Sequence, residues 1–247
     1  MTNPSEENRA RIDLTAALRS ASGLGLGEGI CNHFSLALPG HPDHFLINPQ
    51  GLHWSEITPA DLVVVDAQGR KVSGKHSVEP TAFFIHSAIH RGKASAACVM
   101  HTHMPYATAL TVVQGGRLEW ASQSALKFYQ RVAYDDHYNG LALDDAEGER
   151  MCGEMGGADV LFLGNHGIIV SGPTVAATFD DLYYLERACM LQVLAMSTGK
   201  PLRIVPGAIA EKTGQQMNAE SQQAVLHLEA LKRLLDRDQP GWNQLPE

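Results

Sequence analysis

Short strand patterns alternate with helical patterns along this 247-residue chain, and this alternation constrains its fold most strongly. Apolar residues at every second position predict half-buried strands, and apolar residues three and four apart predict helices. The expected strands cover residues 29–38, 45–47, 63–65, 96–102, 160–163 and 168–171. The expected helices cover residues 5–23, 80–90, 144–155, 174–199 and 209–236, with a further helix opened by Pro105.

The chain has neither an internal repeat nor a linker, so residues 1–247 are predicted to form a single α/β domain. Its ends, at about residues 1–4 and 238–247, are expected to be flexible. Residues 114–139 are polar and rich in turn-forming residues, and their pattern predicts no regular element.

Composition narrows the choice of partners. A hydrophobic content of 44% supports a sizeable core, and a net charge of −8 without a lysine or arginine cluster disfavours nucleic acids and anionic membranes. The four cysteines form no CxxC pair, and the sequence has neither a signal peptide nor an apolar run of membrane length. These features favour a cytoplasmic protein that acts on a small molecule.

Two histidines lie at the end of the expected strand 96–102. In His101-Thr102-His103 the spacing of two places both imidazoles on one face of a strand. Neutral imidazoles bind zinc, manganese, iron, cobalt or nickel, and a catalytic metal usually has three protein ligands and an open position. The motif alone is weak in a chain with 12 histidines.

His166 is a third candidate, because a histidine between small residues, flanked by two expected strands, has little to pack against and is presented to a site. Spacing cannot place it beside His101. Glu79, which precedes Pro80 at an expected helix start, is either an ordinary first-turn acid or, if that helix end faces the metal, a fourth ligand or general base. The remaining histidines are expected at the surface or in packing roles, among them His33, His41, His44, His53, His86, His90 and His227.

Six ordered blocks resemble the class II aldolase/adducin family over nearly the whole chain. These are GICNHFS (29–35), LINPQGL (46–52), ITPADLVVVD (57–66), IHSAIH (85–90), HTH (101–103) and NHG (165–167). The resemblance implies a three-layer α/β/α sandwich with a mainly antiparallel central sheet, assembled as a homotetramer.

The resemblance also implies a chemistry. His101, His103 and His166 match the family's metal ligands, with zinc the expected ion, and Asn32, Gly51 and Ser77 match substrate-binding positions. The implied reaction is cleavage of a carbon–carbon bond in a hydroxy-carbonyl compound through a metal-stabilised enediolate, by aldol cleavage or decarboxylation. Because relatives also catalyse epimerisation and dehydration, the resemblance alone does not select the reaction or decide whether the substrate is phosphorylated.

The chain departs from the aldolases at two catalytic positions. Their glutamate, four residues before the histidine that matches His86, is replaced by Ala82, so Glu79 is expected to serve instead. Residues 121–123, where some aldolases have a tyrosine acid, read Ala-Ser-Gln, and Tyr134 is the expected proton donor, with His137 and Tyr138 as alternatives.

Three hypotheses follow from the sequence. The first is a metal-dependent lyase that uses Glu79 as base or ligand. The second is a binding or scaffold module without catalysis, like an adducin head. The sequences of residues 46–52 and 85–90 favour it, because they resemble adducins more than sugar aldolases. The third is a structural metal site closed by a fourth protein ligand.

Overall fold

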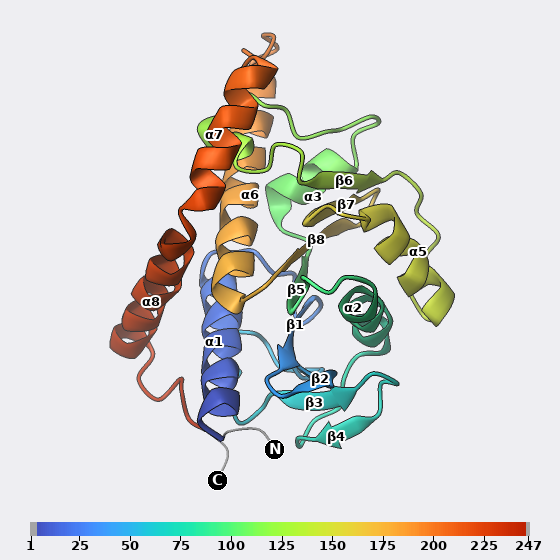
Figure 1. The fold of residues 1–247 in the computed structure, drawn as a ribbon, viewed down its shortest axis with the longest axis vertical. Coiled ribbons are helices and arrows are strands. Elements are labelled where there is room, and N and C mark those ends of the chain that lie inside the picture. Colours follow the sequence, from blue (N-terminus) through green and yellow to red (C-terminus); the bar gives the residue numbers. More distant parts are fainter. Residues whose placement is uncertain (1–3, 246–247) are drawn as a thin grey trace.

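Within residues 4–245, which the computed structural model describes, eight strands form one sheet (Figure 1). The strands are β1 (His33–Leu38), β2 (His41–Ile47), β3 (Val63–Asp66), β4 (Lys71–Ser73), β5 (Cys98–Thr102), β6 (Val132–Asp135), β7 (Val160–Leu163) and β8 (Gly167–Gly172). Their order is β4-β3-β2-β1-β5-β8-β7-β6, with every neighbouring pair antiparallel except β6 and β7. The expected mainly antiparallel sheet is confirmed.

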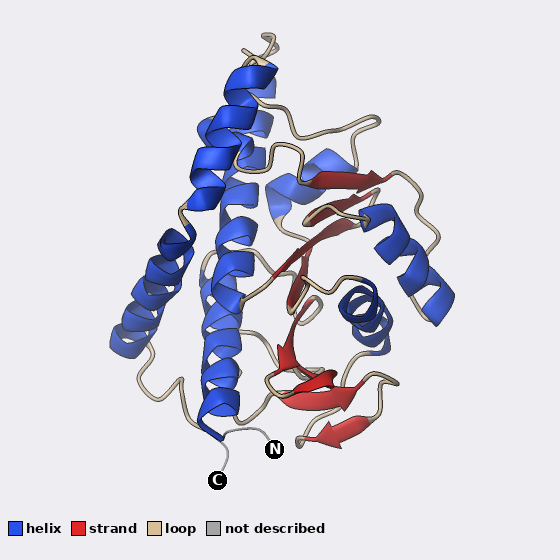
Figure 2. Ribbon diagram, in the orientation of Figure 1, coloured by secondary structure: helices blue, strands red, loops and turns tan. Residues whose placement is uncertain are grey.

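Helices cover both faces of the sheet (Figure 2). One face carries α1 (Pro4–Gly23), α3 (Pro105–Thr111), α6 (Val175–Met196) and α8 (Ser221–Asp238), with α4 (Gln123–Leu126) against α6 and α7 (Gly207–Ala219) against α4. The opposite face carries α2 (Pro80–Gly92) and α5 (Asp145–Met155). This arrangement confirms the three-layer α/β/α sandwich.

The two-residue period of the strands divides the core between the two faces. On β5, Cys98 and Met100 pack with α1 and α6, whereas Val99 packs with α2 and α5. His101 therefore points to the α2 face. On β1, the same alternation places His33 and Ser35 on that face, because Phe34 packs on the other.

Several predicted boundaries differ from the structure, among them the start of β2, which lies at His41 and not at residue 45. The strand expected from residue 29 begins at His33, because Asn32 has a left-handed backbone (φ 82°) that interrupts an extended chain. The helix expected over 209–236 is two helices, broken at Glu220 (φ −85°, ψ 54°). The unassigned residues 114–139 contain α4 and β6, and β6 is an edge strand that pairs only with β7 among the described strands.

The termini were expected to be flexible, and residues 1–3 and 246–247 lie outside the described part. Near the C-terminus, Trp242 is 3% exposed within the core, and its indole N–H donates to the Asp236 carboxylate at 2.9 Å. The flexibility of the remaining terminal residues stays a prediction. None of the helices in residues 4–245 is both long and apolar enough to cross a membrane.

Candidate metal centre

Three imidazole rings converge where β5 ends and β7 turns into β8. His101 lies on β5, His103 directly follows that strand, and His166 lies in the β7–β8 turn. Since Thr102 pairs with Ile168 across β5 and β8, the turn and the strand end meet. Ring centroids lie 5.0 Å (His101–His103), 4.8 Å (His101–His166) and 4.7 Å (His103–His166) apart. We call these residues the three-histidine group.

The local backbone explains why His166 is presented in this way. Asn165 adopts a left-handed conformation (φ 58°), which asparagine tolerates better than most residues, and the His166 N–H donates to the Leu163 carbonyl at 3.1 Å. A side chain at Gly167 would place its Cβ 2.5 Å from the Thr102 carbonyl oxygen and 2.6 Å from Cδ2 of His103. The close approach of His103 therefore requires glycine at this position.

Hydrogen bonds select the tautomers of two of the rings. His101 donates from Nδ1 to the Ile168 carbonyl at 2.9 Å, and His103 donates from Nδ1 to the Glu28 carboxylate at 2.6 Å. Carbonyl and carboxylate oxygens only accept, so each Nε2 retains its lone pair. The Nε2 atom of His103 is buried and has no hydrogen-bond partner. An unpaired buried acceptor of this kind is what a metal ion would satisfy.

The donor set fits a divalent metal. One ring nitrogen from each histidine lies within 4.8 Å of the others, and ligands about 2.1 Å from one ion lie up to about 4.2 Å apart, so small ring rotations suffice. Burial lowers the pKa of His101 well below its usual value. Burial lowers the pKa of His166 to about 4. Both rings are therefore neutral at pH 7, the state that binds metal.

The three-histidine group leaves coordination positions open. Among the histidine, cysteine, aspartate and glutamate side chains of residues 4–245, only His101, His103 and His166 lie close enough together to hold one metal ion. Glu79 is outside this group. A three-nitrogen site without a fourth protein ligand is the arrangement of catalytic rather than structural zinc centres.

Glu79 lies outside the three-histidine group and forms a hydrogen bond with His33. His33 donates from Nε2 to Glu79 Oε2 at 2.6 Å, and the Thr81 hydroxyl donates to Oε1 at 2.6 Å. The His33 bond, followed by that from Thr81, outweighs burial and lowers the pKa of Glu79 to about 2. His33 and Glu79 line a cavity of about 160 Å³ with Ile30, Cys31, Asn48, Pro49, Gln50 and Ala82. The pair thus presents a charged carboxylate to a small cavity.

His33 connects this cavity to the three-histidine group, a role that sequence reasoning missed. His33 and His101 are cross-strand partners on β1 and β5, and their rings stack at 5.5 Å. Behind them, the Ser35 hydroxyl bridges Nδ1 of His86 at 2.6 Å and Nε2 of His90 at 2.7 Å. The available signal was the period of two, which places His33 and Ser35 on one strand face.

Comparison with known proteins agrees with this arrangement. The pattern of the Class II Aldolase and Adducin N-terminal domain matches residues 12–193, which span all three histidines of the group. The chain belongs to the class II aldolase and adducin family. The earlier resemblance is thereby confirmed.

Three similar proteins match this chain over most of its length. A protein of Pseudomonas aeruginosa named as an aldolase class 2 protein is 36% identical, covering 96% of this chain and 93% of the relative. Decarboxylase NovR of Streptomyces niveus is 33% identical, covering 86% of this chain and 80% of the relative. The crystal structure of an aldolase II superfamily protein from Pseudomonas syringae is 35% identical, with a TM-score of 0.91 and 98% of each chain covered.

The family's usual glutamate position is occupied by a buried alanine that borders the small cavity. Ala82 is 1% exposed and packs with Phe45 and Val63 between α2 and the sheet. A carboxylate there would have to be buried. Glu79, one turn earlier at the start of α2, is the acidic residue that the fold directs to the cavity.

The three predicted substrate-binding residues differ in their surroundings. Asn32 is buried, and its Oδ1 accepts from the backbone N–H groups of Glu28 at 3.1 Å and His103 at 3.2 Å, while its Nδ2 has no partner. Gly51 is exposed with φ 87°. The Ser77 hydroxyl donates to the Gln50 side chain at 3.3 Å, at the rim of the cavity. Their role in substrate binding stays a prediction.

Tyr134 and Tyr138, the two candidate proton donors, lie in different surroundings. Tyr134 packs with the α1 and α6 core, on the face opposite His101, and its phenol oxygen accepts from the Leu118 N–H at 2.9 Å. Burial raises its pKa to about 12. Tyr138, in contrast, is 53% exposed with its ring 6.2 Å from that of His166. The geometry thus favours Tyr138 over the Tyr134 assignment.

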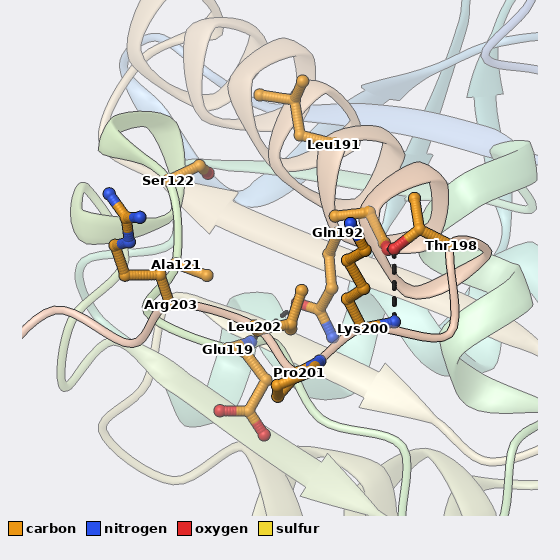
Figure 3. A pocket seen from close by; sticks show the side chains of 11 residues that line it. Glu119, Ala121, Ser122, Leu191, Gln192, Thr198, Lys200, Pro201, Leu202 and Arg203 are labelled. Atoms are coloured by element: carbon orange, nitrogen blue, oxygen red, sulfur yellow. Dashed lines mark hydrogen bonds between the residues drawn. The ribbon is translucent and has the colours of Figure 1, made fainter.

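Residues 121–123, where some aldolases have a tyrosine, lie at a different cavity (Figure 3). Ala121 and Ser122 line a space of about 380 Å³ with Leu191 and Gln192 of α6 and the segment Thr198–Arg203 that follows it. Gln192 accepts there from the Glu119 N–H at 2.7 Å. Ala121 and Ser122, which stand where some aldolases have a tyrosine, therefore line the cavity at the end of α6 and not the cavity that contains Glu79.

Proposed function

We propose that this protein is a divalent-metal-dependent lyase that cleaves a carbon–carbon bond of a small hydroxy-carbonyl compound, by aldol cleavage or decarboxylation. The observation that carries the proposal is the three-histidine group, with two Nε2 lone pairs set by hydrogen bonds and no fourth ligand among the described residues. Zinc is the ion we expect, and manganese, cobalt, nickel and iron suit the same ligands. The decarboxylase among the relatives supports a lyase chemistry.

The side chains divide the work around the ion. A bound divalent cation would act as a Lewis acid that stabilises negative charge developing on a substrate oxygen. Glu79 enters the reaction charged, as a proton acceptor must, although its bond from His33 makes it a weaker base than a free glutamate. His33 holds the carboxylate in place between the cavity and the histidines.

The small cavity supports a substrate without a phosphate group. Its volume is about 160 Å³, and its described lining residues include neither lysine nor arginine. Phosphate sites in proteins commonly use those cations. A hydroxy-carbonyl compound without a phosphate group, whose oxygens could approach the three-histidine group, suits this cavity better than a sugar phosphate.

Metal content and bond cleavage test the proposal together. The protein purified from cells should contain close to one divalent ion per chain by mass spectrometry of metals, and chelation should abolish activity that zinc, cobalt or manganese restores. Substrates are screened as matched hydroxy-carbonyl acids and sugar phosphates, with products identified by NMR. A native protein that neither contains nor takes up metal would refute the proposal.

The two tyrosines give a second test. We propose Tyr138 as the proton donor in place of Tyr134, because its ring lies beside His166. Tyr138→Phe should lower kcat by about 100-fold with metal retained, the scale of a lost general acid. Tyr134→Phe should change kcat less than threefold, an order-of-magnitude expectation for a phenol on the opposite face of the sheet. Equal activity of Tyr138→Phe and the wild type would remove Tyr138 from the mechanism.

A scaffold function without catalysis is the second candidate, and Ala82 is the observation that favours it. The residue fills, with a buried methyl group, the position of the aldolases' glutamate. In that case the three-histidine group would be a remnant. The metal and cleavage assays separate the two candidates, because a scaffold needs neither an ion nor turnover.

Assembly and location remain predictions. From the family resemblance we propose a homotetramer, which light scattering of the purified protein would test: a monomer in solution would refute it. A cytoplasmic location is proposed from the sequence, and fractionation of the source cells would test it.

A further inference from the structure

One residue outside the proposed ligand set touches it directly. Glu28 lies in the connection between α1 and β1, and its Oε2 accepts the hydrogen bond from Nδ1 of His103 at 2.6 Å. The two residues are 75 positions apart in sequence. The glutamate side chain is 68% exposed, so no packing requirement explains why it lies against the ring.

The backbone around Glu28 is tied to the same histidine. Oδ1 of Asn32 accepts from the N–H of Glu28 at 3.1 Å and from the N–H of His103 at 3.2 Å. The Cys31 N–H donates to the Glu28 carbonyl at 3.0 Å, which closes the turn. Residues 28–32 therefore form hydrogen bonds with both the backbone and the ring of His103. The turn that they make holds the Glu28 carboxylate beside Nδ1 of that ring.

This contact has a chemical consequence for the ring. A carboxylate only accepts, so His103 carries its proton on Nδ1 and presents the lone pair of Nε2. That Nε2 is buried without a partner. His101 is oriented in the same sense by a backbone carbonyl, whereas His103 depends on a side chain.

The carboxylate also contributes charge. Imidazole ligands bring no negative charge to a divalent ion, and the Glu28 carboxylate places one 2.6 Å from Nδ1 of His103. A carboxylate hydrogen-bonded behind a metal-binding histidine orients the ring and strengthens its donation to the ion.

We infer that Glu28 is a positioning residue for the metal centre, which sets the tautomer and orientation of His103 and places a negative charge behind it. The inference rests on the proposed metal-dependent function.

Metal affinity measures this role without reference to activity. Zinc and cobalt dissociation constants are determined by competition with a chromophoric chelator for the wild type, Glu28→Ala, Glu28→Gln and the control Glu154→Ala, an exposed glutamate on α5. Glu28→Ala should bind about 10–100-fold more weakly, the usual effect of losing such a partner. Glu28→Gln, which keeps an acceptor but not the charge, should lie between, and Glu154→Ala should match the wild type.

The imidazole tautomer provides the second readout. In the metal-free protein, ¹⁵N NMR of the histidine rings should show His103 in one tautomer, protonated at Nδ1, and a mixture of tautomers in Glu28→Ala. Matched melting temperatures of the metal-free variants exclude general unfolding. Wild-type affinity and an unchanged tautomer in Glu28→Ala would overturn the inference. A wild type without metal affinity would instead refute the proposed function, and the tautomer would still test the contact.

Discussion

The double substitution His101→Ala/His103→Ala is expected to leave a folded protein that binds no metal and has no lyase activity. Both rings supply Nε2 lone pairs, and only His166 would remain of the three-histidine group. A full protein ligand set for zinc is worth about 10 kcal/mol or more, so losing two of three ligands should weaken binding by at least about a thousandfold. Metal per chain after dialysis is the measurement, with His53→Ala, an exposed histidine, as control.

Folding must be separated from metal loss in that experiment, because His101 is 1% exposed and stacks on His33. His166→Ala serves this purpose, since the residue lies in a turn and is only partly buried. It should lose metal and activity while its circular dichroism stays that of the wild type. Stoichiometric metal in a folded His166→Ala variant would exclude His166 as a ligand.

Glu79→Gln is expected to lower kcat by about 10²–10⁴-fold while the metal stays bound. The substitution keeps an acceptor for His33 and the side-chain shape but removes the negative charge, and this range is the usual contribution of a general base. Retained metal would also exclude Glu79 as a required fourth ligand, in agreement with its position outside the three-histidine group.

The matched control is Glu154→Gln, which removes one exposed carboxylate far along the chain on α5 and should leave kcat unchanged. Metal content, kcat and KM are measured for both variants with the substrate found in the screen. Full activity of Glu79→Gln would remove Glu79 from the mechanism and strengthen the scaffold hypothesis that Ala82 suggests.

Local periodicity accounts for most of the fold that could be predicted. β7 is wholly apolar, β8 contains the apolar run 168–170, and α2 begins at a proline and follows a helical apolar pattern, so neighbouring residues suffice to recognise them. By contrast, β6 is a short edge strand whose pairing with β7 depends on the β5–β8 framework. The break at Glu220 was missed because polar and apolar residues continue with a helical period on either side.

For the candidate metal centre, too, some features follow from local sequence and others only from the tertiary structure. The sequence by itself determined the candidate ligands, because the period of a strand places His101 and His103 together and the residues around His166 require a tight turn. Only the tertiary structure decided that these segments meet, since the pairing of β5 with β8 is a non-local contact. The same holds for Glu79 with His33 and for Glu28 with His103, which are 46 and 75 residues apart. Such contacts arise from the order of strands in the sheet, which no local pattern encodes.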